Sequence, residues 1–110
     1  MRIGMDIGST TIKCVVLDEN DQIIYSAYER HYSHILEKTR ELLTSLNDTY
    51  LKGKKAYFAI SGSAGMGLAD SCGVSFVQEV FADRVAANRL NPGTDCIIEL
   101  GGEDLSLIHI

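Results

Sequence analysis

Three segments with the pattern of short β-strands follow one another at the start of the chain, and they constrain its fold more than any other feature. They cover Arg2–Ile7, Thr11–Leu17 and Gln22–Arg30. Gly8 follows the first segment, and the polar turn 18–21 follows the second. Apolar or β-branched runs bounded by turn residues at this spacing predict two successive hairpins, and therefore an antiparallel β-meander.

Helical and strand patterns alternate along the rest of the chain. Ser33 can cap a helix that runs to about Tyr50, and Ala56–Ile60 reads as a strand. The later predicted elements are a short helix within Gly65–Cys72, an extended piece at Val74–Val77, a helix at Gln78–Leu90 and a strand at Cys96–Leu100. A meander followed by crossover units predicts a mixed sheet with helices on its faces. The predicted fold class is therefore α/β and ribonuclease-H-like.

Each of the two longer helices has apolar residues at helical spacing, which predicts one buried face per helix. These residues are Ile35, Leu36, Leu42, Leu43, Leu46 and Tyr50 in the first helix, and Val80, Phe81, Val85 and Ala86 in the second. We also expect Phe58, Phe76 and Phe81 to belong to the core.

Composition limits the classes of function. The 110 residues carry a net charge of -5, which argues against non-specific nucleic-acid binding because such binding needs a basic face. No apolar run is long enough to span a membrane, and Met1 leads directly into strand-like sequence, so we expect a cytoplasmic protein. The cysteines, Cys14, Cys72 and Cys96, are odd in number and widely spaced, which favours reduced thiols over disulfides or a metal site.

The turn after the first strand is the first candidate site. Its residues are Asp6, Gly8, Ser9, Thr10, Thr11 and Lys13. Gly8 lets the turn approach a ligand closely, and the three hydroxyl residues offer backbone N–H groups and oxygens that suit phosphate. Asp6 at the strand end can hold Mg²⁺ directly or through water, and Lys13 either reaches the phosphates or lies on the solvent face. The alternative is plain turn chemistry, which also favours Asp, Gly and Ser.

The turn after the last apolar strand is the second candidate site. It contains Gly101, Gly102, Glu103 and Asp104 after Glu99 and Leu100. We predict that the two turns face one cleft, where one binds phosphates and the other supplies acids for the metal and for orienting water. A tight hairpin with an acidic rim is the alternative.

These motifs carry a resemblance to a known family. The stretch from Asp6 to Lys13 resembles the first phosphate motif of the superfamily of sugar kinases, heat-shock chaperones and actin. Within it, the chain is most similar to activases of 2-hydroxyacyl-CoA dehydratases and to benzoyl-CoA reductase ATPase subunits. Segments 28–33, 61–67, 76–79 and 99–104 look like the long members, in which activase and dehydratase parts share one polypeptide.

The resemblance implies roles for particular residues. Gly8, Ser9, Thr10, Thr11 and Lys13 map onto the first phosphate loop. The second loop takes Gly101 and Gly102 with Glu103 as the catalytic residue, and Asp6 and Asp104 lie near Mg²⁺. Glu99 stands where many relatives have Asp, and Glu103 where short activases have Gln, so the residue that positions water stays open.

The resemblance also implies cofactors and partners. Members bind ATP and form a homodimer around one [4Fe-4S] cluster, and ATP hydrolysis drives an electron into the dehydratase component. The cluster thiolates of the family follow the second loop, so none of the three cysteines here is assigned as a ligand. We expect residues 1–104 to be the first half of an actin-like ATPase domain, which alone does not turn over ATP because half a cleft holds phosphate weakly.

Two other functions remain open at this point. A sugar or carboxylate kinase would share both loops, and a non-enzymatic actin-like protein would bind nucleotide only to change shape. A thiolate pair beyond Asp104 selects the activase, whereas a catalytic Asp over a sugar site selects the kinase.

The last six residues, Leu105–Ile110, depart from the relatives, which continue with a strand beginning Ala-Lys. They can be encoded as CTG TCT CTT ATA CAC ATC, which spells a transposase end sequence used in sequencing-library adapters. We therefore expect 105–110 to be a non-native tail, the alternative being a genuine short strand. Any other codon choice in the encoding DNA rejects the adapter interpretation.

Two further features have mainly structural interpretations. His31 and His34 flank Ser33, and without an evident third ligand we expect solvated histidines rather than a metal pair. The glycine loop 61–67 could touch a nucleotide or a partner, but we expect a strand-to-helix turn whose glycines permit close packing.

Overall fold

The computed structural model describes residues 1–100 and 105–109, with side chains through residue 98. By its internal contacts the chain divides into two compact units, Met1–Phe76 and Val77–Ile110. Each unit is described by itself.

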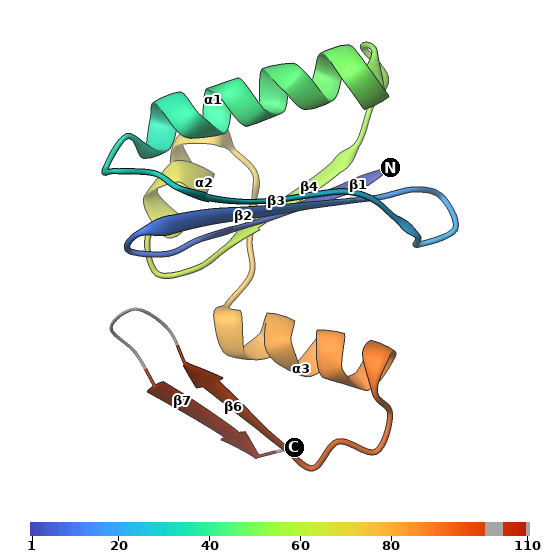
Figure 1. Cartoon of the computed structure of the whole chain (residues 1–110), viewed down its shortest axis with the longest axis vertical. Helices are drawn as coiled ribbons and strands as arrows, with labels where there is room; N and C mark the ends of the chain where they lie inside the picture. The colour runs from blue at the N-terminus through green and yellow to red at the C-terminus, as the bar shows by residue number, and fades with distance from the viewer. Residues whose placement is uncertain (101–104, 110) are drawn as a thin grey trace. The chain divides into compact units, whose positions relative to one another are not determined.

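The first unit is built on a five-stranded mixed sheet of order β3-β2-β1-β4-β5 (Figure 1). The strands are β1 (Arg2–Ile7), β2 (Thr11–Leu17), β3 (Ile23–Arg30), β4 (Tyr57–Ser61) and β5 (Ser75–Phe76). Neighbours among β1, β2 and β3 are antiparallel, as the meander predicts, and β4 runs parallel to both β1 and β5. The predicted α/β fold with a meander and crossover helices is confirmed.

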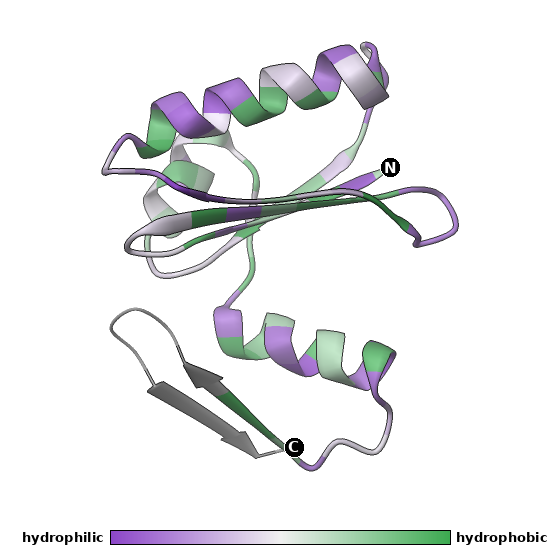
Figure 2. Cartoon of the chain, in the orientation of Figure 1, coloured by the Kyte–Doolittle hydropathy of each residue, from purple (hydrophilic) through white to green (hydrophobic). Residues whose placement is uncertain are grey.

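Helices cover one face of this sheet. They are α1 (Ile35–Leu46), extended by the π-helical turn Asn47–Leu51, and α2 (Met66–Cys72). Figure 2 shows the apolar stripe of α1 directed toward the sheet. The buried cluster joins strands and helices and contains Ile3, Met5, Ile7, Ile12, Cys14, Val16, Leu42, Leu46, Ile60 and Ala69. Burying a large apolar side chain contributes about 1.5–3 kcal/mol, so this cluster is the main stabilising element of the unit.

Strand alternation sends the polar residues of β1 to the opposite face. Ile3, Met5 and Ile7 are buried under the helices, whereas Arg2 and Asp6 alternate with them along the strand. Asp6 is thus the last outward-facing residue before the turn that leads into β2. The pleat therefore fixes which side of the sheet the candidate carboxylate occupies.

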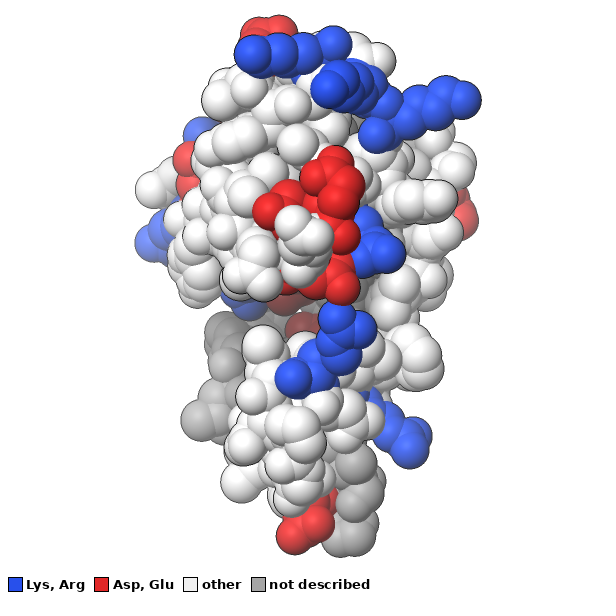
Figure 3. Space-filling view, turned by 90° about the vertical axis from the view of Figure 1, so that its right-hand side faces the viewer, with Lys and Arg blue, Asp and Glu red and all other residues white. Residues whose placement is uncertain are grey.

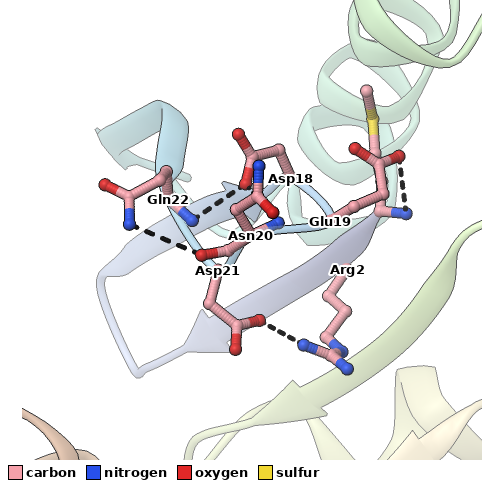
Figure 4. A network of polar contacts seen from close by, with 7 residues as sticks. Arg2, Asp18, Glu19, Asn20, Asp21 and Gln22 are labelled. Atoms are coloured by element: carbon pink, nitrogen blue, oxygen red, sulfur yellow. Dashed lines mark hydrogen bonds and ion pairs between the residues drawn. The ribbon is translucent and has the colours of Figure 1, made fainter.

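The β2–β3 turn at the far end of the sheet is held by local polar contacts (Figure 4). The Asp18 carboxylate accepts hydrogen bonds from the backbone N–H of Asn20 at 2.8 Å and of Gln22 at 3.0 Å. Arg2 pairs with Asp21, which has a left-handed φ of 59°. Figure 3 views the molecule from this side and shows acidic side chains gathered next to basic ones. These groups stabilise a turn that lies away from the candidate site.

The second unit contains α3 (Glu79–Leu90), β6 (Cys96–Leu100) and β7 (Leu105–His109). β6 and β7 pair antiparallel, with Leu100 opposite Leu105. No side chain of α3 is buried. β7 covers five residues of the segment that we expect to be non-native, and the origin of that segment stays a prediction that the encoding codons test.

Several local predictions were wrong. Ser33 does not cap α1: the N-cap is His34, without a side-chain cap bond, because Ser33 lies in a tight turn with a φ of 64°. Leu36 is 56% exposed, since it lies at the edge of the apolar stripe rather than over the sheet. Phe81, expected in the core, is 58% exposed on α3. The buried face predicted for this helix was also wrong, since Val80 and Val85 are 41% and 46% exposed and no side chain of α3 is buried.

In the part of the chain that the structure describes, no helix has both the length and the apolar character needed to cross a membrane.

Candidate functional site

Three connections meet at one end of the first unit's sheet, opposite the β2–β3 turn. They join β1 to β2, β3 to α1 and β4 to α2 (Figure 1). The first of them is the predicted phosphate turn. Its Gly8 N–H donates to the Thr11 carbonyl at 2.9 Å, directly beyond the paired residues Ile7 and Ile12. The tip residues Ser9 and Thr10 are exposed, so their hydroxyls and amides are accessible to a ligand.

Asp6 and Lys13 lie side by side next to this turn. They are register partners on β1 and β2, and Lys13 Nζ is 3.3 Å from Asp6 Oδ2. Lys13 also lies over the Tyr28 ring, with Nζ 5.6 Å from the centroid. Both ion-pair partners are partly exposed, so the pair contributes at most about 1 kcal/mol to stability. Its main consequence is that the positively charged Lys13 ammonium group is held beside the turn.

The glycine loop after β4 packs against the other side of Asp6. Gly62 has a φ of 100°, and a Cβ there would lie 2.3 Å from the Ile7 carbonyl oxygen and 2.5 Å from Asp6 Oδ1. The Ala64 N–H donates to the same Ile7 carbonyl at 2.9 Å. Only glycine fits this backbone conformation and this contact. The prediction of close packing at this loop is confirmed, and the loop buttresses the Asp6 carboxylate.

Ser61 supplies a second oxygen at this strand end. It is the register partner of Asp6 in the parallel β1–β4 pair, so the two side chains leave the same face of the sheet. Within residues 1–98, the Ser61 hydroxyl oxygen is buried and has no hydrogen-bond partner. An orphaned oxygen beside a carboxylate fits a site for a hard cation with a phosphate ligand.

His31 is the residue of this site whose environment the sequence did not predict. We expected a solvated side chain, but it is only 2% exposed, and its Nε2 lies 2.9 Å from the Gly8 carbonyl oxygen. The pairing of Thr11 with Arg30 places the residue after β3 beside the turn, which buries the imidazole. His34 is exposed, as expected. One sequence feature could have predicted this burial: His31 directly follows β3, and β3 pairs with β2, the strand that begins at the turn.

The second predicted turn lies outside the described residues. Gly101, Gly102, Glu103 and Asp104 therefore stay predicted site residues, and so does their meeting with the first turn. Among the side chains that the structure describes, no three His, Cys, Asp or Glu residues gather around a common point. A metal site at Asp6 would need ligands beyond this set, such as a phosphate, water or Asp104.

The cysteines occupy different environments. Cys14 is buried in the core, and this burial raises the pKa of its thiol to about 11. Cys72 and Cys96 are exposed. All three are free thiols.

Comparison with known proteins gives a similar curated sequence and several solved structures of similar fold. The chain is 21% identical over 108 residues to the (R)-2-hydroxyglutaryl-CoA dehydratase activating ATPase of Acidaminococcus fermentans. The crystal structure of component A of that dehydratase matches with a TM-score of 0.82 and 22% identity. The activator of the 2-hydroxyisocaproyl-CoA dehydratase from Clostridium difficile, solved with bound ADPNP, matches with a TM-score of 0.81 and 24% identity.

These matches include almost all of this chain but less than half of each of the other proteins. They cover 98–99% of this chain but only 40–42% of the other proteins, so the chain spans about two-fifths of their length. No protein-family model matches. The chain is homologous to part of the activating ATPase of (R)-2-hydroxyglutaryl-CoA dehydratase, and it shares the fold of the matching part of the solved dehydratase activators.

Proposed function

We propose that this chain forms the first phosphate-binding part of an ATP-dependent activase for a 2-hydroxyacyl-CoA dehydratase or a related acyl-CoA reductase. The observation that carries the proposal is the joint packing of three connections around the β1–β2 turn, in a fold shared with a dehydratase activator that binds ADPNP. Nucleotide binding is the coarse part of the proposal. Electron transfer from a [4Fe-4S] cluster, the homodimer and the dehydratase partner are the finer parts, and they rest on the similarity alone.

Different residues would contact the phosphates, supply positive charge and hold Mg²⁺. Ser9, Thr10 and Thr11 offer backbone N–H groups and hydroxyls to the phosphates. Lys13 contributes positive charge beside the same turn. Asp6 and Ser61, together with Asp104 of the second turn, are the residues that would hold Mg²⁺, which supplies charge neutralisation to the phosphates when it is bound. Gly101 and Gly102 would provide the second phosphate loop, and Glu103 the acid that orients water.

The proposal is tested by titrating the 110-residue chain with Mg²⁺-tripolyphosphate and following backbone amide signals by NMR. We expect the largest shifts at Gly8–Thr11, with weak, millimolar-range affinity because only one wall of the cleft is present. Asp6→Asn should weaken Mg²⁺-dependent binding, whereas Asp18→Asn, at the far turn of the same sheet, should not change it. Shifts confined to other parts of the chain would overturn the assignment of this turn.

The finer parts need a longer protein that includes this chain, produced without oxygen. We expect an iron–sulfur absorption spectrum, ATP hydrolysis, and ATP-dependent reduction of a dehydratase component. A longer protein that phosphorylates a sugar or a carboxylate instead would contradict the activase assignment while leaving the phosphate turn intact.

A further inference from the structure

Two hydrogen bonds of His31 connect the end of β3 to the β1–β2 turn. The His31 backbone N–H donates to the Thr10 carbonyl at 3.0 Å. Its Nε2 lies 2.9 Å from the Gly8 carbonyl oxygen, and its Nδ1 lies 3.0 Å from the Ser33 backbone nitrogen. Two of these contacts reach the turn that we propose for phosphate. The imidazole therefore links the turn to the segment that leads to α1.

The hydrogen-bond partners of the ring select one tautomer of the side chain. A backbone N–H can only donate, so the Ser33 bond requires Nδ1 to be an acceptor without a proton. A carbonyl oxygen can only accept, so the Gly8 bond requires a proton on Nε2. These contacts fit a single form of the side chain, the neutral imidazole protonated on Nε2. The charged form carries protons on both nitrogens and would lose the Ser33 bond.

The backbone around His31 is shaped to complete this arrangement. Tyr32 and Ser33 both have left-handed φ angles, 50° and 64°, which bring the Ser33 N–H back toward the ring. Two consecutive non-glycine residues in this region are energetically costly, so surrounding contacts must hold them there. The His34 N–H closes the turn on the His31 carbonyl at 2.7 Å. The histidine and its strained turn act as one unit.

The contacts with Gly8 and Thr10 set the direction of neighbouring amides. In a trans peptide group the N–H points opposite to the C=O. Because the Gly8 carbonyl points to His31, the Ser9 N–H points away from it. The Thr10 carbonyl likewise points to the His31 N–H, so the Thr11 N–H points away from β3. We propose that neutral His31 is the positioning residue of the phosphate turn, fixing two of its peptide planes for an anionic ligand. This inference rests on the proposed function only where it concerns phosphate.

The chain offers a matched pair of variants that separate the two ring contacts. In His31→Asn the side-chain oxygen replaces Nδ1 and keeps an acceptor for Ser33, but the donor to Gly8 is lost. In His31→Gln the longer amide keeps a donor for Gly8. His34→Gln is the control, because His34 is exposed and its ring nitrogen is 3.8 Å from the Glu37 carboxylate.

The first measurement is the ¹⁵N NMR spectrum of the histidine rings in the unmodified chain. We expect His31 to give the Nε2-protonated neutral pattern, and a Nδ1-protonated or charged ring would overturn the inference. The second measurement is amide hydrogen exchange at Gly8 and at residue 31, whose N–H groups donate to the Thr11 and Thr10 carbonyls and so report opening of the turn. We expect about tenfold faster exchange in His31→Asn, restored to within about threefold in His31→Gln, as the loss and return of one hydrogen bond predict. Equal exchange in both variants would overturn it.

The third measurement is Mg²⁺-tripolyphosphate binding by the same variants. We expect about tenfold weaker binding in His31→Asn and near-normal binding in His31→Gln and His34→Gln. If tripolyphosphate does not bind the unmodified chain, the proposed function fails, while the ring spectrum and the exchange rates still decide the role of His31. If His31→Asn does not fold, the ring spectrum and His31→Gln decide it.

Discussion

At the scale of single residues, the site depends on close contacts that leave little room for substitution. The tightest is Gly62, whose missing side chain makes space for Asp6 and the Ile7 carbonyl. We predict that Gly62→Ala destabilises the fold by about 1–3 kcal/mol and weakens phosphate binding, because it adds both a clash and a strained φ.

Gly67 is the matched control for this prediction. It lies within α2, and a Cβ there would meet nothing within 4 Å. Gly67→Ala should therefore be neutral or stabilising by up to about 1 kcal/mol. Urea unfolding of both variants measures the difference, and equal stabilities would contradict the packing role of Gly62.

Cys14 gives a second prediction at this scale. Its thiol is buried and neutral, so a thiol reagent should label Cys72 and Cys96 quickly in the folded chain and Cys14 only after unfolding. Because folding raises the Cys14 pKa from 9.0 to about 11, the folded state binds this proton more tightly than the unfolded chain. The free energy of unfolding should thus fall as pH rises through this window. Cys14→Ala should flatten that part of the pH profile, and labelling of all three thiols at one rate would refute the burial.

At the scale of elements, α1 is held by a narrow stripe of contacts. Leu46 is 1% exposed in the core cluster, whereas Leu36 on the same helix is 56% exposed. We predict that Leu46→Ala lowers the free energy of unfolding by about 2–5 kcal/mol and that Leu36→Ala costs less than about 1 kcal/mol. Thermal unfolding followed by circular dichroism compares them, and similar losses would contradict the orientation of the helix.

The elements themselves could largely be predicted from the sequence, because their patterns are local. The meander, α1 and the strand at Cys96–Leu100 follow from apolar periodicity and turn residues, whereas the apolar spacing in α3 does not correspond to a buried face. The start of α1 could not be predicted this way, since Ser33 is drawn into the turn around His31 rather than into a cap. The close packing at the glycine loop was predicted, but the contact of Gly62 with Asp6 and the burial of His31 were not, because both arise from pairing between distant strands.

At the scale of the whole molecule, the two units are built differently. Among the side chains described through residue 98, every member of the buried cluster and every partly buried side chain packed against it lies within residues 1–76. We predict that a fragment of residues 1–76 unfolds cooperatively, with a stability within about 1 kcal/mol of the 110-residue chain. A fragment ending at Ser61 lacks α2 and β5 and should unfold without cooperativity. Urea titration tests both, and an unfolded 1–76 fragment would refute the prediction.

The catalytic competence of the chain also belongs to this scale. We predict no turnover of ATP by the purified 110 residues, because a single phosphate-binding wall does not enclose the reacting groups. A sensitive phosphate-release assay checks this, with the longer protein as the positive control. Sustained release by the short chain would show that the second half of the domain is dispensable.

The parallel pairing of β1 with β4 has a consequence for protein synthesis. The first hairpin leaves the ribosome early, yet the Asp6 carboxylate acquires its Gly62 neighbour only after β4 has been inserted beside β1. Contacts so distant in sequence form late and slowly compared with local hairpins. A nascent chain therefore passes through a stage in which the turn has formed but Gly62 does not yet pack against Asp6. At that stage we expect the proposed phosphate turn to bind its ligand more weakly than in the folded chain.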